Sequence, residues 1–374
     1  MSTVQRLLPR SVLLLSLGLL TVLPAPAADI DVKGKAPAPA DVAAKVEEYM
    51  RARVAVHQFS GSILIAKGGQ IVVSKGYGLA NREHDVANIP QTKFRIGSVT
   101  KQFTVMAILL LEKQGKLKVD DPIARHLPDA PATWKDVTIH HLMSHTAGIP
   151  EYTSTPAFRE IRTTTMTLPK IIAMFKDKPL DFKPGEMFRY SNAGYILLGQ
   201  IIETVSGKSY EEFVRTNIFT PLQMNDSGYD HFKPVLQHRA TGYARDGSTL
   251  VNSSYFDMSI PHAAGALYST VEDLNRWDQA LYEAKLLPRA TLDRMFTIVR
   301  WNYGYGWTIG TKFNRKSQGH GGSIYGFRSM VTRFPEEKVY VVVLSNVEGT
   351  PVDAINRDLA AIVFGEKYEI PEKN

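Results

Sequence analysis

The sequence predicts an α+β fold in which an antiparallel sheet is flanked by N- and C-terminal helices and carries a large, mainly helical insertion. Three observations favour this class. Hairpin patterns lie near both ends of the chain, and a helix pattern accompanies each of them. The long middle of the chain is mainly helical. Strands and helices do not alternate from start to end, which argues against a doubly wound parallel sheet.

The composition is that of an ordinary globular protein. Apolar residues make up 44% of the 374 residues, enough to bury a large core, which excludes a disordered chain. The counts of 27 glycines and 21 prolines exclude a collagen-like chain. Because there is no cysteine, the chain has no disulfide framework, thiolate nucleophile, iron–sulfur cluster or cysteine-bearing zinc site.

Residues 1–28 have the pattern of a signal peptide. Arg6 and Arg10 are the only charged side chains in the first ten residues. An apolar run then extends from Val12 to Leu23, and small residues follow where a signal peptidase would cut. The run is shorter than the ~20 residues that a membrane-spanning helix needs. We therefore expect export to the periplasm or the medium of a bacterium, with no stable membrane span after cleavage. An uncleaved anchor is the alternative.

The charge pattern does not indicate a nucleic-acid partner. The formal net charge of +7 falls to +5 when the two arginines of the signal peptide are removed, and the remaining charge is spread along the chain. No run of Lys and Arg resembles a nucleic-acid patch. A mild positive field would favour anionic substrates weakly.

A single domain is predicted over residues 41–366. A flexible leader rich in Ala and Pro precedes it at 29–40, and a tail follows at 367–374. Within the domain, the α/β part comprises about 41–91 and 301–366, and the helical part about 92–300.

The elements are predicted in chain order from local patterns. Asp41 is a favourable cap for a helix that runs to about Val54. Turn residues then separate β-branched segments, and apolar spacing marks the helices. The predicted ranges are strands Gly61–Ala66 and Gln70–Lys75 around the turn Lys67–Gly69, helices Thr100–Gln114, Tyr195–Val205 and Asp273–Ala284, strands Arg328–Phe334 and Val339–Ser345 around Pro335–Lys338, and a helix from Pro351 to about Phe364.

The first candidate motif is Ser98-Val99-Thr100-Lys101, at the mouth of an apolar helix. Residues three apart share a helix face, so the Ser98 hydroxyl and the Lys101 amine can approach one another. A serine becomes a nucleophile when a neighbour takes its proton, and a lysine whose pKa is lowered can do so. This is the only Ser-x-x-Lys in the chain. Alternatively, Ser98 caps the helix and Lys101 is solvated.

The second motif is Tyr190-Ser191-Asn192, the only Tyr-x-Asn in the chain. A phenol close to an ammonium loses its proton more easily, so Tyr190 is a candidate proton shuttle. Asn192 has a donor and an acceptor with which to hold a substrate amide or Lys101. Alternatively, Asn192 is an ordinary helix N-cap and Tyr190 a half-buried ring.

The third motif is His320-Gly321-Gly322-Ser323, which we place just before a strand that starts near Arg328. Glycines allow a substrate to lie close to the backbone. An exposed strand edge there would pair with an extended acyl group, and the amides of Ser98 and Ser323 would form an oxyanion hole.

The three motifs occur once each, in this order, separated by 92 and 130 residues. Together they resemble the penicillin-recognising serine hydrolases, which comprise serine β-lactamases, D-Ala-D-Ala carboxypeptidases and related esterases. The resemblance covers roughly Ala43 to Phe364. It extends to the segments Leu142–Gly148, Pro221–Met224 and Tyr303–Trp307.

The resemblance implies a β-lactamase/transpeptidase-like fold and a role for each motif. Ser98 is the expected nucleophile, Lys101 the proton acceptor and Tyr190 the proton relay. Asn192, His320, Gly322 and Ser323 are the expected substrate-binding residues. Tyrosine at position 190 looks like class C β-lactamases and the related carboxypeptidases. The third motif of the family is usually Lys-Thr-Gly. His320 stands in place of its lysine, which looks more like the carboxypeptidase and esterase branches.

Other site chemistries fit the sequence less well. His140, His141 and His145 form the densest histidine cluster, but no His-Glu-x-x-His pattern completes it, so no metal is expected. We expect His145 to hydrogen-bond backbone near the site instead. No Gly-x-Ser-x-Gly elbow of an α/β-hydrolase occurs. The tyrosines of the segment Tyr303–Trp307 are expected to pack rather than react.

The expected function is that of a serine hydrolase that forms an acyl-enzyme on Ser98 and needs no cofactor. Its substrate would be a small molecule or a peptidoglycan-derived acyl compound, cleaved as by a D-Ala-D-Ala carboxypeptidase or an esterase. A class C-like β-lactamase is the alternative enzyme, and a non-catalytic protein that binds cell-wall peptides is the alternative of another class. His320, with an ordinary pKa of ~6.5, would make hydrolysis respond to pH near neutrality. The sequence does not predict an oligomeric state.

Overall fold

The structure is a computed structural model that describes residues 38–372. The predicted signal peptide at 1–28, residues 29–37 of the predicted leader and the last two residues of the predicted tail lie outside the described residues. The described residues fall within one compact unit. No helix among residues 38–372 is both long and apolar enough to span a bilayer.

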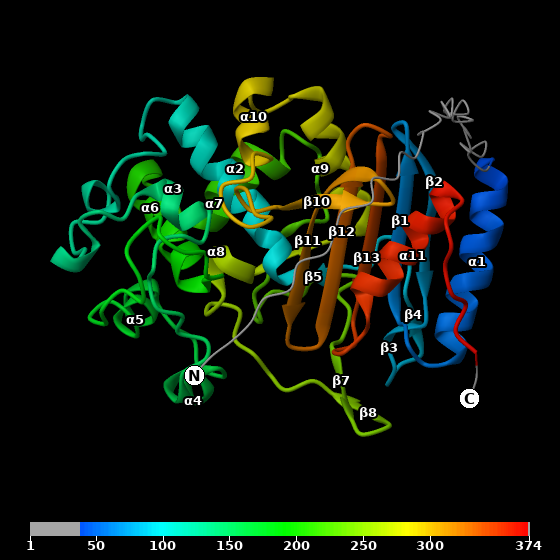
Figure 1. Ribbon diagram of the computed structural model, residues 1–374. Helices are drawn as coiled ribbons and strands as arrows, with labels where there is room; N and C mark the ends of the chain where they lie inside the picture. The colour runs from blue at the N-terminus through cyan, green and yellow to red at the C-terminus, as the bar shows by residue number, and fades with distance from the viewer. Residues whose placement is uncertain (1–37, 373–374) are drawn as a thin grey trace, which may run out of the picture. The chain divides into compact units, whose positions relative to one another are not determined.

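A six-stranded antiparallel sheet joins the two ends of the chain (Figure 1). Its order is β10 (Thr308–Lys312), β11 (Arg315–Ile324), β12 (Phe327–Phe334), β13 (Val339–Ser345), β1 (Gly61–Lys67) and β2 (Gln70–Tyr77). The two hairpins expected from the sequence meet where β1 pairs with β13, with Leu64 opposite Val342. This arrangement confirms the predicted fold class.

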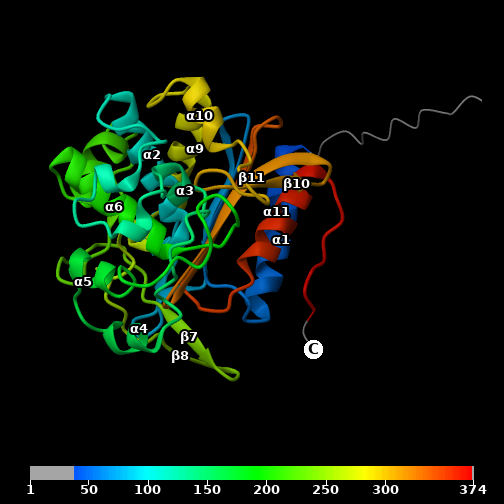
Figure 2. The ribbon, with the colours of Figure 1, turned by 60° about the vertical axis from the view of Figure 1, so that its left-hand side comes forward.

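Two terminal helices, α1 (Pro39–Ala55) and α11 (Val352–Phe364), cover one face of the sheet (Figures 1 and 2). Apolar side chains of both helices pack with those of β1 and β13 in a separate core cluster. α1 starts at Pro39 with Ala38 as its N-cap, not at Asp41 as predicted. Proline suits the first helical position because its missing N–H has no partner there. Asp41 lies in the first turn instead, where its charge favours the helix dipole.

The helical region lies on the opposite side of the sheet (Figure 2). Its central helix, α2 (Thr100–Lys113), is buried from Thr100 to Leu111, as expected for a helix that is apolar all round. The region's other helices are α3 (Ile139–Met143), α4 (Pro156–Ile161), α5 (Leu168–Ala173), α6 (Asn192–Ser206), α7 (Tyr210–Val214), α8 (His262–Gly265), α9 (Val271–Glu283) and α10 (Arg289–Met295).

The part of the sequence between β2 and β10 also contains short strands that were not predicted. They form a three-stranded sheet and two two-stranded ones. The strands are β3 (Leu79–Asn81), β4 (Val86–Ala87), β5 (Phe94–Arg95), β6 (Gly228–Tyr229), β7 (Tyr243–Asp246), β8 (Thr249–Asn252) and β9 (Leu267–Ser269).

The glycine-rich third motif precedes β12, which starts at Phe327, so its predicted place before a strand near Arg328 is confirmed. The motif itself lies inside β11, a strand that was not predicted. Glycine is depleted in strands, which hid the strand from the sequence analysis. A Cβ at Gly322 would lie 2.1 Å from the carbonyl oxygen of Ile96. The glycine is therefore needed for close packing of β11 against the chain that precedes the nucleophile.

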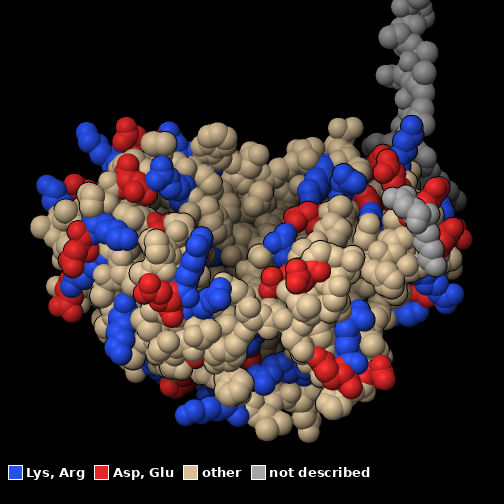
Figure 3. Space-filling view, turned by 90° about the horizontal axis from the view of Figure 1, so that it is seen from below, with Lys and Arg blue, Asp and Glu red and all other residues tan. Residues whose placement is uncertain are grey.

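Charges of both signs are mixed over the face drawn in Figure 3. Lys and Arg are interspersed with Asp and Glu there, and neither sign gathers into one large patch. This distribution agrees with the even spread of charge along the sequence.

Candidate active site

Ser98 and Lys101 meet at the start of α2. Ser98 lies in a 3₁₀ turn, Gly97–Val99, that leads directly into the helix, and Lys101 is in the first helical turn. Lys101 Nζ lies 3.0 Å from Ser98 Oγ. Ser98 is partly exposed, whereas Lys101 is fully buried. The nucleophile candidate is therefore accessible to a substrate, and its neighbouring amine is not exposed to water.

Two further acceptors fix the Lys101 amine. Nζ donates to Asn192 Oδ1 at 2.9 Å and to the carbonyl oxygen of Ala264 at 2.8 Å. Burial lowers the pKa of Lys101 to about 7, although the charge of Glu151 acts in the opposite direction. An amine with this pKa is partly neutral at neutral pH.

Asn192 is the first residue of α6, and the helix cap is its neighbour. The Ser191 side chain accepts from the amide of Gly194, so Ser191 and not Asn192 is the N-cap. The backbone amide of Asn192 donates to Glu151. The asparagine side chain is therefore free of capping and points its carbonyl oxygen at Lys101.

Tyr190 lies beside both members of the first motif. Its ring centroid is 4.8 Å from Lys101 Nζ, and its hydroxyl is hydrogen-bonded with Ser98. Burial raises the pKa of Tyr190 above its ordinary value, and the hydrogen bond with Ser98 offsets only part of the rise. The prediction that this phenol loses its proton more easily is wrong, because desolvation of the phenolate raises the pKa of Tyr190 and the charge of Glu151 acts in the same direction.

His320, in β11, lies near Tyr190. Its ring centroid lies 6.1 Å from that of Tyr190, and only 6% of the residue is exposed. Burial, together with the charge of Lys101, lowers the pKa of His320 to about 4. The predicted response of His320 to pH near neutrality is therefore wrong, because the imidazole is neutral throughout that range.

Tyr303 connects His320 to the second motif through a chain of hydrogen bonds. The amide of Ser191 donates to His145 Nδ1 at 3.1 Å, which leaves the proton of this imidazole on Nε2. Tyr303 Oη lies 3.2 Å from His145 Nε2 and 2.9 Å from His320 Nε2. His320 Nδ1 donates to the carbonyl oxygen of Gly321 at 2.7 Å. Consequently, Tyr303 accepts from His145 and donates to His320.

Only part of this series of hydrogen bonds was predicted from the sequence. The prediction that His145 hydrogen-bonds backbone near the site is confirmed by its bond with Ser191. Tyr303, expected to be ordinary packing, joins two imidazoles instead. The segment Tyr303–Trp307 is part of the family resemblance, and this was the sequence signal that could have identified Tyr303 as a site residue.

Backbone packing brings Gly322 and Ser323 to the nucleophile. A Cβ at Gly97 would lie 2.9 Å from the amide nitrogen of Ser323, and Gly97 itself has a φ of +50°. The turn that carries Ser98 therefore lies directly against β11. The seven site residues predicted from the sequence come from three separate stretches and meet in one place.

A cavity of about 460 Å³ opens in front of Ser98. Asn192 and Ser323 also line it, and its other walls are mainly apolar and aromatic. The aromatic and aliphatic lining residues are Tyr152, Phe158, Phe256, Ile260, Pro261, Ala264, Ile324 and Tyr325.

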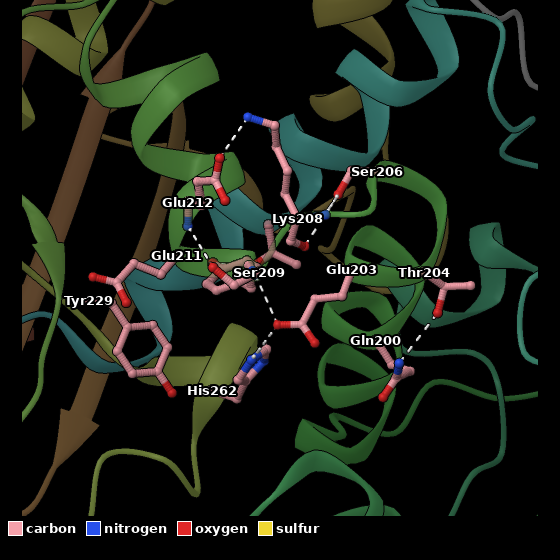
Figure 4. A network of polar contacts seen from close by, with 12 residues as sticks. Gln200, Glu203, Thr204, Ser206, Lys208, Ser209, Glu211, Glu212, Tyr229 and His262 are labelled. Atoms are coloured by element: carbon pink, nitrogen blue, oxygen red, sulfur yellow. Dashed lines mark hydrogen bonds and ion pairs between the residues drawn. The ribbon is translucent and has the colours of Figure 1, made fainter.

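Figure 4 shows a polar network that includes His262, on the helix α8 that also carries Ala264. His262, at the start of α8, lies 3.5 Å from Glu203 Oε1, which also accepts from the amide of Tyr210 at 2.9 Å. A Cβ at Gly199 would lie 2.6 Å from His262 Nδ1, so a glycine is needed where α6 meets α8. These contacts fix the carbonyl oxygen that Lys101 uses.

The clustered histidines have separate partners. His140 Nδ1 lies 2.6 Å from Tyr305 Oη, and His141 forms a capping box with Thr138. Over residues 38–372, no group of three or more His, Asp or Glu side chains is placed to hold a metal ion.

The chain is similar to known proteins over most of its length. The family described as Beta-lactamase matches residues 42–364. Penicillin-binding protein 4* of Bacillus subtilis (strain 168) is 32% identical over 340 residues, which cover 85% of this chain and 75% of that protein. The octameric penicillin-binding protein homologue from Pyrococcus abyssi has 33% identity and a TM-score of 0.78, covering 87% of this chain and 78% of that chain.

A further similar structure is the D-amino acid amidase from Ochrobactrum anthropi SV3, solved with L-phenylalanine amide. It has 25% identity and a TM-score of 0.76, and the match covers 87% of this chain and 98% of that chain. The family match extends over most of the chain, and relatives at 30% identity or more match most of its length. This chain therefore belongs to the Beta-lactamase family of serine hydrolases.

Proposed function

We propose that the protein hydrolyses an ester or amide bond through an acyl-enzyme on Ser98, as a D-Ala-D-Ala carboxypeptidase or an esterase does. The observation that carries this proposal is the buried Lys101 amine, 3.0 Å from Ser98 Oγ and with a pKa lowered to about 7. A neutral amine has two N–H groups and one lone pair. With the two N–H groups donated to Asn192 and Ala264, the lone pair is directed at the Ser98 hydroxyl.

Acylation then follows from these positions. Ser98 Oγ bonds to the substrate carbonyl carbon while its proton passes to Lys101 Nζ. The bond to the leaving group breaks as that group takes a proton from the Tyr190 hydroxyl, which is replenished from the Lys101 ammonium. The raised pKa of Tyr190 suits this role, because a neutral phenol carries the proton to be donated. Water then attacks the ester, releases the acid and restores the Ser98 hydroxyl.

Backbone and imidazole groups would bind the substrate. The amides of Ser98 and Ser323 would hold the oxyanion, and the close packing of Gly97 on Ser323 supports this assignment. His320 and Gly322 would lie along the bound acyl group, and Asn192 would hold its amide. No cofactor takes part in this scheme.

Relatives support amide or ester substrates of modest size. The D-amino acid amidase with the same fold acts, by its name, on amides of D-amino acids. The penicillin-binding relatives support a cell-wall peptide or a related acyl compound as substrate. A location outside the cytoplasm, reached through the predicted signal peptide, agrees with a peptidoglycan-derived substrate.

Covalent labelling tests the proposal. A fluorescent fluorophosphonate should label the wild-type protein and should not label the variant Ser98→Ala. The matched control is Ser144→Ala, which changes a buried serine at the C-terminal end of α3 and should still be labelled. Absence of label on the wild-type protein, with any acylating probe, would support the non-catalytic binder.

A second assay separates the candidate enzymes. A short-chain nitrophenyl ester, a peptide ending in D-Ala-D-Ala and a chromogenic cephalosporin are compared side by side. We expect the ester or the peptide to be turned over fastest. Faster turnover of the cephalosporin would favour the class C-like β-lactamase.

A further inference from the structure

The catalytic cavity extends along strand β11 to a carboxylate at its far end. From Ser98 its wall follows Ser323, Ile324 and Tyr325, and Glu348 completes the lining. The amide of Gly326, in the turn after β11, donates to Glu348 Oε1 at 2.6 Å. Glu348 therefore marks the point at which the strand ends and the chain turns back.

The Glu348 side chain is held in place and still has an unused oxygen. Ser253 Oγ also donates to Oε1, at 2.7 Å, so the two partners of this side chain in the described part of the chain share one oxygen. Glu348 is partly exposed. Its Oε2 is therefore available to a ligand in the cavity without loss of the contacts that orient the side chain.

The charge of the cavity has one sign. Glu348 is the only charged side chain among the residues that line it within the described chain, and none of them is Lys or Arg. Near the nucleophile, Glu151 adds a second carboxylate, whose charge raises the pKa of Lys101. At Glu348, a carboxylate on the substrate would meet like charge and no Lys or Arg of the cavity lining, whereas an ammonium group would be attracted.

The free edge of β11 leads from Ser323 toward the turn at Gly326. β10 pairs with β11 only from Arg315 to Gly319, so the edge of β11 beyond Gly319 is not covered by β10. β11 ends at Ile324, and Tyr325 and Gly326 form the turn into β12, so an acyl chain extended along this edge past Ser323 would approach the turn that Glu348 contacts.

From these observations we infer that Glu348 forms an ammonium subsite, so that the preferred acyl donors carry a positively charged group at the end of the acyl chain, and not a carboxylate. This inference rests on the proposed acyl-enzyme chemistry of Ser98 and adds a substrate class to it. The acyl group keeps its ammonium through both steps, since the only bonds made and broken are those at the carbonyl carbon.

Three p-nitrophenyl esters of matched length test the inference. The esters of 8-aminooctanoic acid, nonanoic acid and azelaic acid end in an ammonium, a methyl and a carboxylate group. For the wild-type protein we expect kcat/KM to be highest for the aminooctanoate, by ~5- to 50-fold over the azelate, as for a partly exposed, charge-assisted hydrogen bond. Raising the salt concentration should reduce this ratio, because salt screens the pair.

The variant Glu348→Gln keeps the acceptor for Gly326 and Ser253 and removes the charge. We expect the ratio between the aminooctanoate and the azelate to fall to near one. Glu336→Gln removes the same charge in the turn between β12 and β13, at the opposite end of these strands, and should keep the wild-type ratio. A thermal melt of each variant checks that the fold is intact.

The outcomes distinguish the inference from the proposed function. A wild-type preference for the azelate, or a ratio in Glu348→Gln equal to that of the wild type, would overturn the subsite. If no ester is hydrolysed in a Ser98-dependent way, the proposed function itself fails. If the nonanoate is hydrolysed through Ser98 with no effect of terminal charge, only the subsite fails.

Discussion

Tyr303 donates a hydrogen bond to His320 across 2.9 Å, and this bond fixes the proton of a neutral imidazole on its other nitrogen. The two residues come from different segments, and His145 completes the arrangement from a third. His320 therefore presents one defined tautomer to the cavity region, although the sequence contains no local pattern that would require it.

Removing this phenol should disturb the site more than the fold. In Tyr303→Phe, the facing nitrogens of His145 and His320 lose their partner, and we expect kcat/KM to fall ~10-fold for a loss of 1–2 kcal/mol. Nitrogen chemical shifts of His320 would report a mixture of tautomers. Tyr305→Phe, which removes a phenol bonded to His140 at 2.6 Å, is the matched control and should leave these shifts unchanged. Equal effects of the two variants would contradict a positioning role for Tyr303.

The pH dependence of acylation should follow Lys101. The amine accepts a proton only when it is neutral, so kcat/KM for a neutral ester should rise with pH through a pKa of about 7 and then level off. In His320→Gln the same inflection should persist, because the pKa of His320 is about 4. If the inflection near pH 7 disappears in that variant, His320 and not Lys101 is the titrating group.

Loss of the lysine amine should abolish most turnover. Lys101→Ala is expected to reduce kcat by at least ~100-fold, the usual cost of removing a positioned acid or base. Lys312→Ala is a suitable control, because burial also lowers the pKa of Lys312, which lies in β10 outside the cavity lining. Steady-state ester hydrolysis measures both variants. Unchanged turnover in Lys101→Ala would refute its role as the base.

A methyl group at Gly322 should force β11 away from the nucleophile. The added Cβ would lie 2.1 Å from the Ile96 carbonyl oxygen and 2.3 Å from Ser329 Oγ. We expect Gly322→Ala to lower the free energy of unfolding by ~1–3 kcal/mol and to reduce activity with it. Gly310→Ala, in β10, meets nothing within 4 Å and should change neither quantity. Urea denaturation and ester hydrolysis give the two readouts, and a fully active, stable Gly322→Ala would contradict this packing.

Local patterns predicted the parts of the fold that depend on neighbours in the sequence. The β-branched run Val339–Ser345 was predicted with the bounds that the structure has, because a buried central strand needs such residues throughout. The pair Ser98 and Lys101 was predicted from helical spacing alone, and its 3.0 Å contact agrees.

Long-range packing decided the features that the sequence analysis missed. The glycines of β11 disfavour a strand locally, and only the close approach of Ile96 explains them. The pKa values of Tyr190 and His320 depend on burial by distant segments. The prediction for Tyr190 considered only a nearby ammonium and had the wrong direction, and the prediction for His320 used its ordinary pKa and had the wrong range.

The pairing of β1 with β13 also determines when this molecule can fold. Residues 68–338 separate the two strands, so contacts that close the sheet span most of the polypeptide. Folding through such distant contacts is slow. Until β13 has been synthesised, β1 has a bare apolar edge that can pair with other chains. A nascent or truncated chain ending before Val339 should therefore aggregate or require a chaperone, whatever the state of its helices.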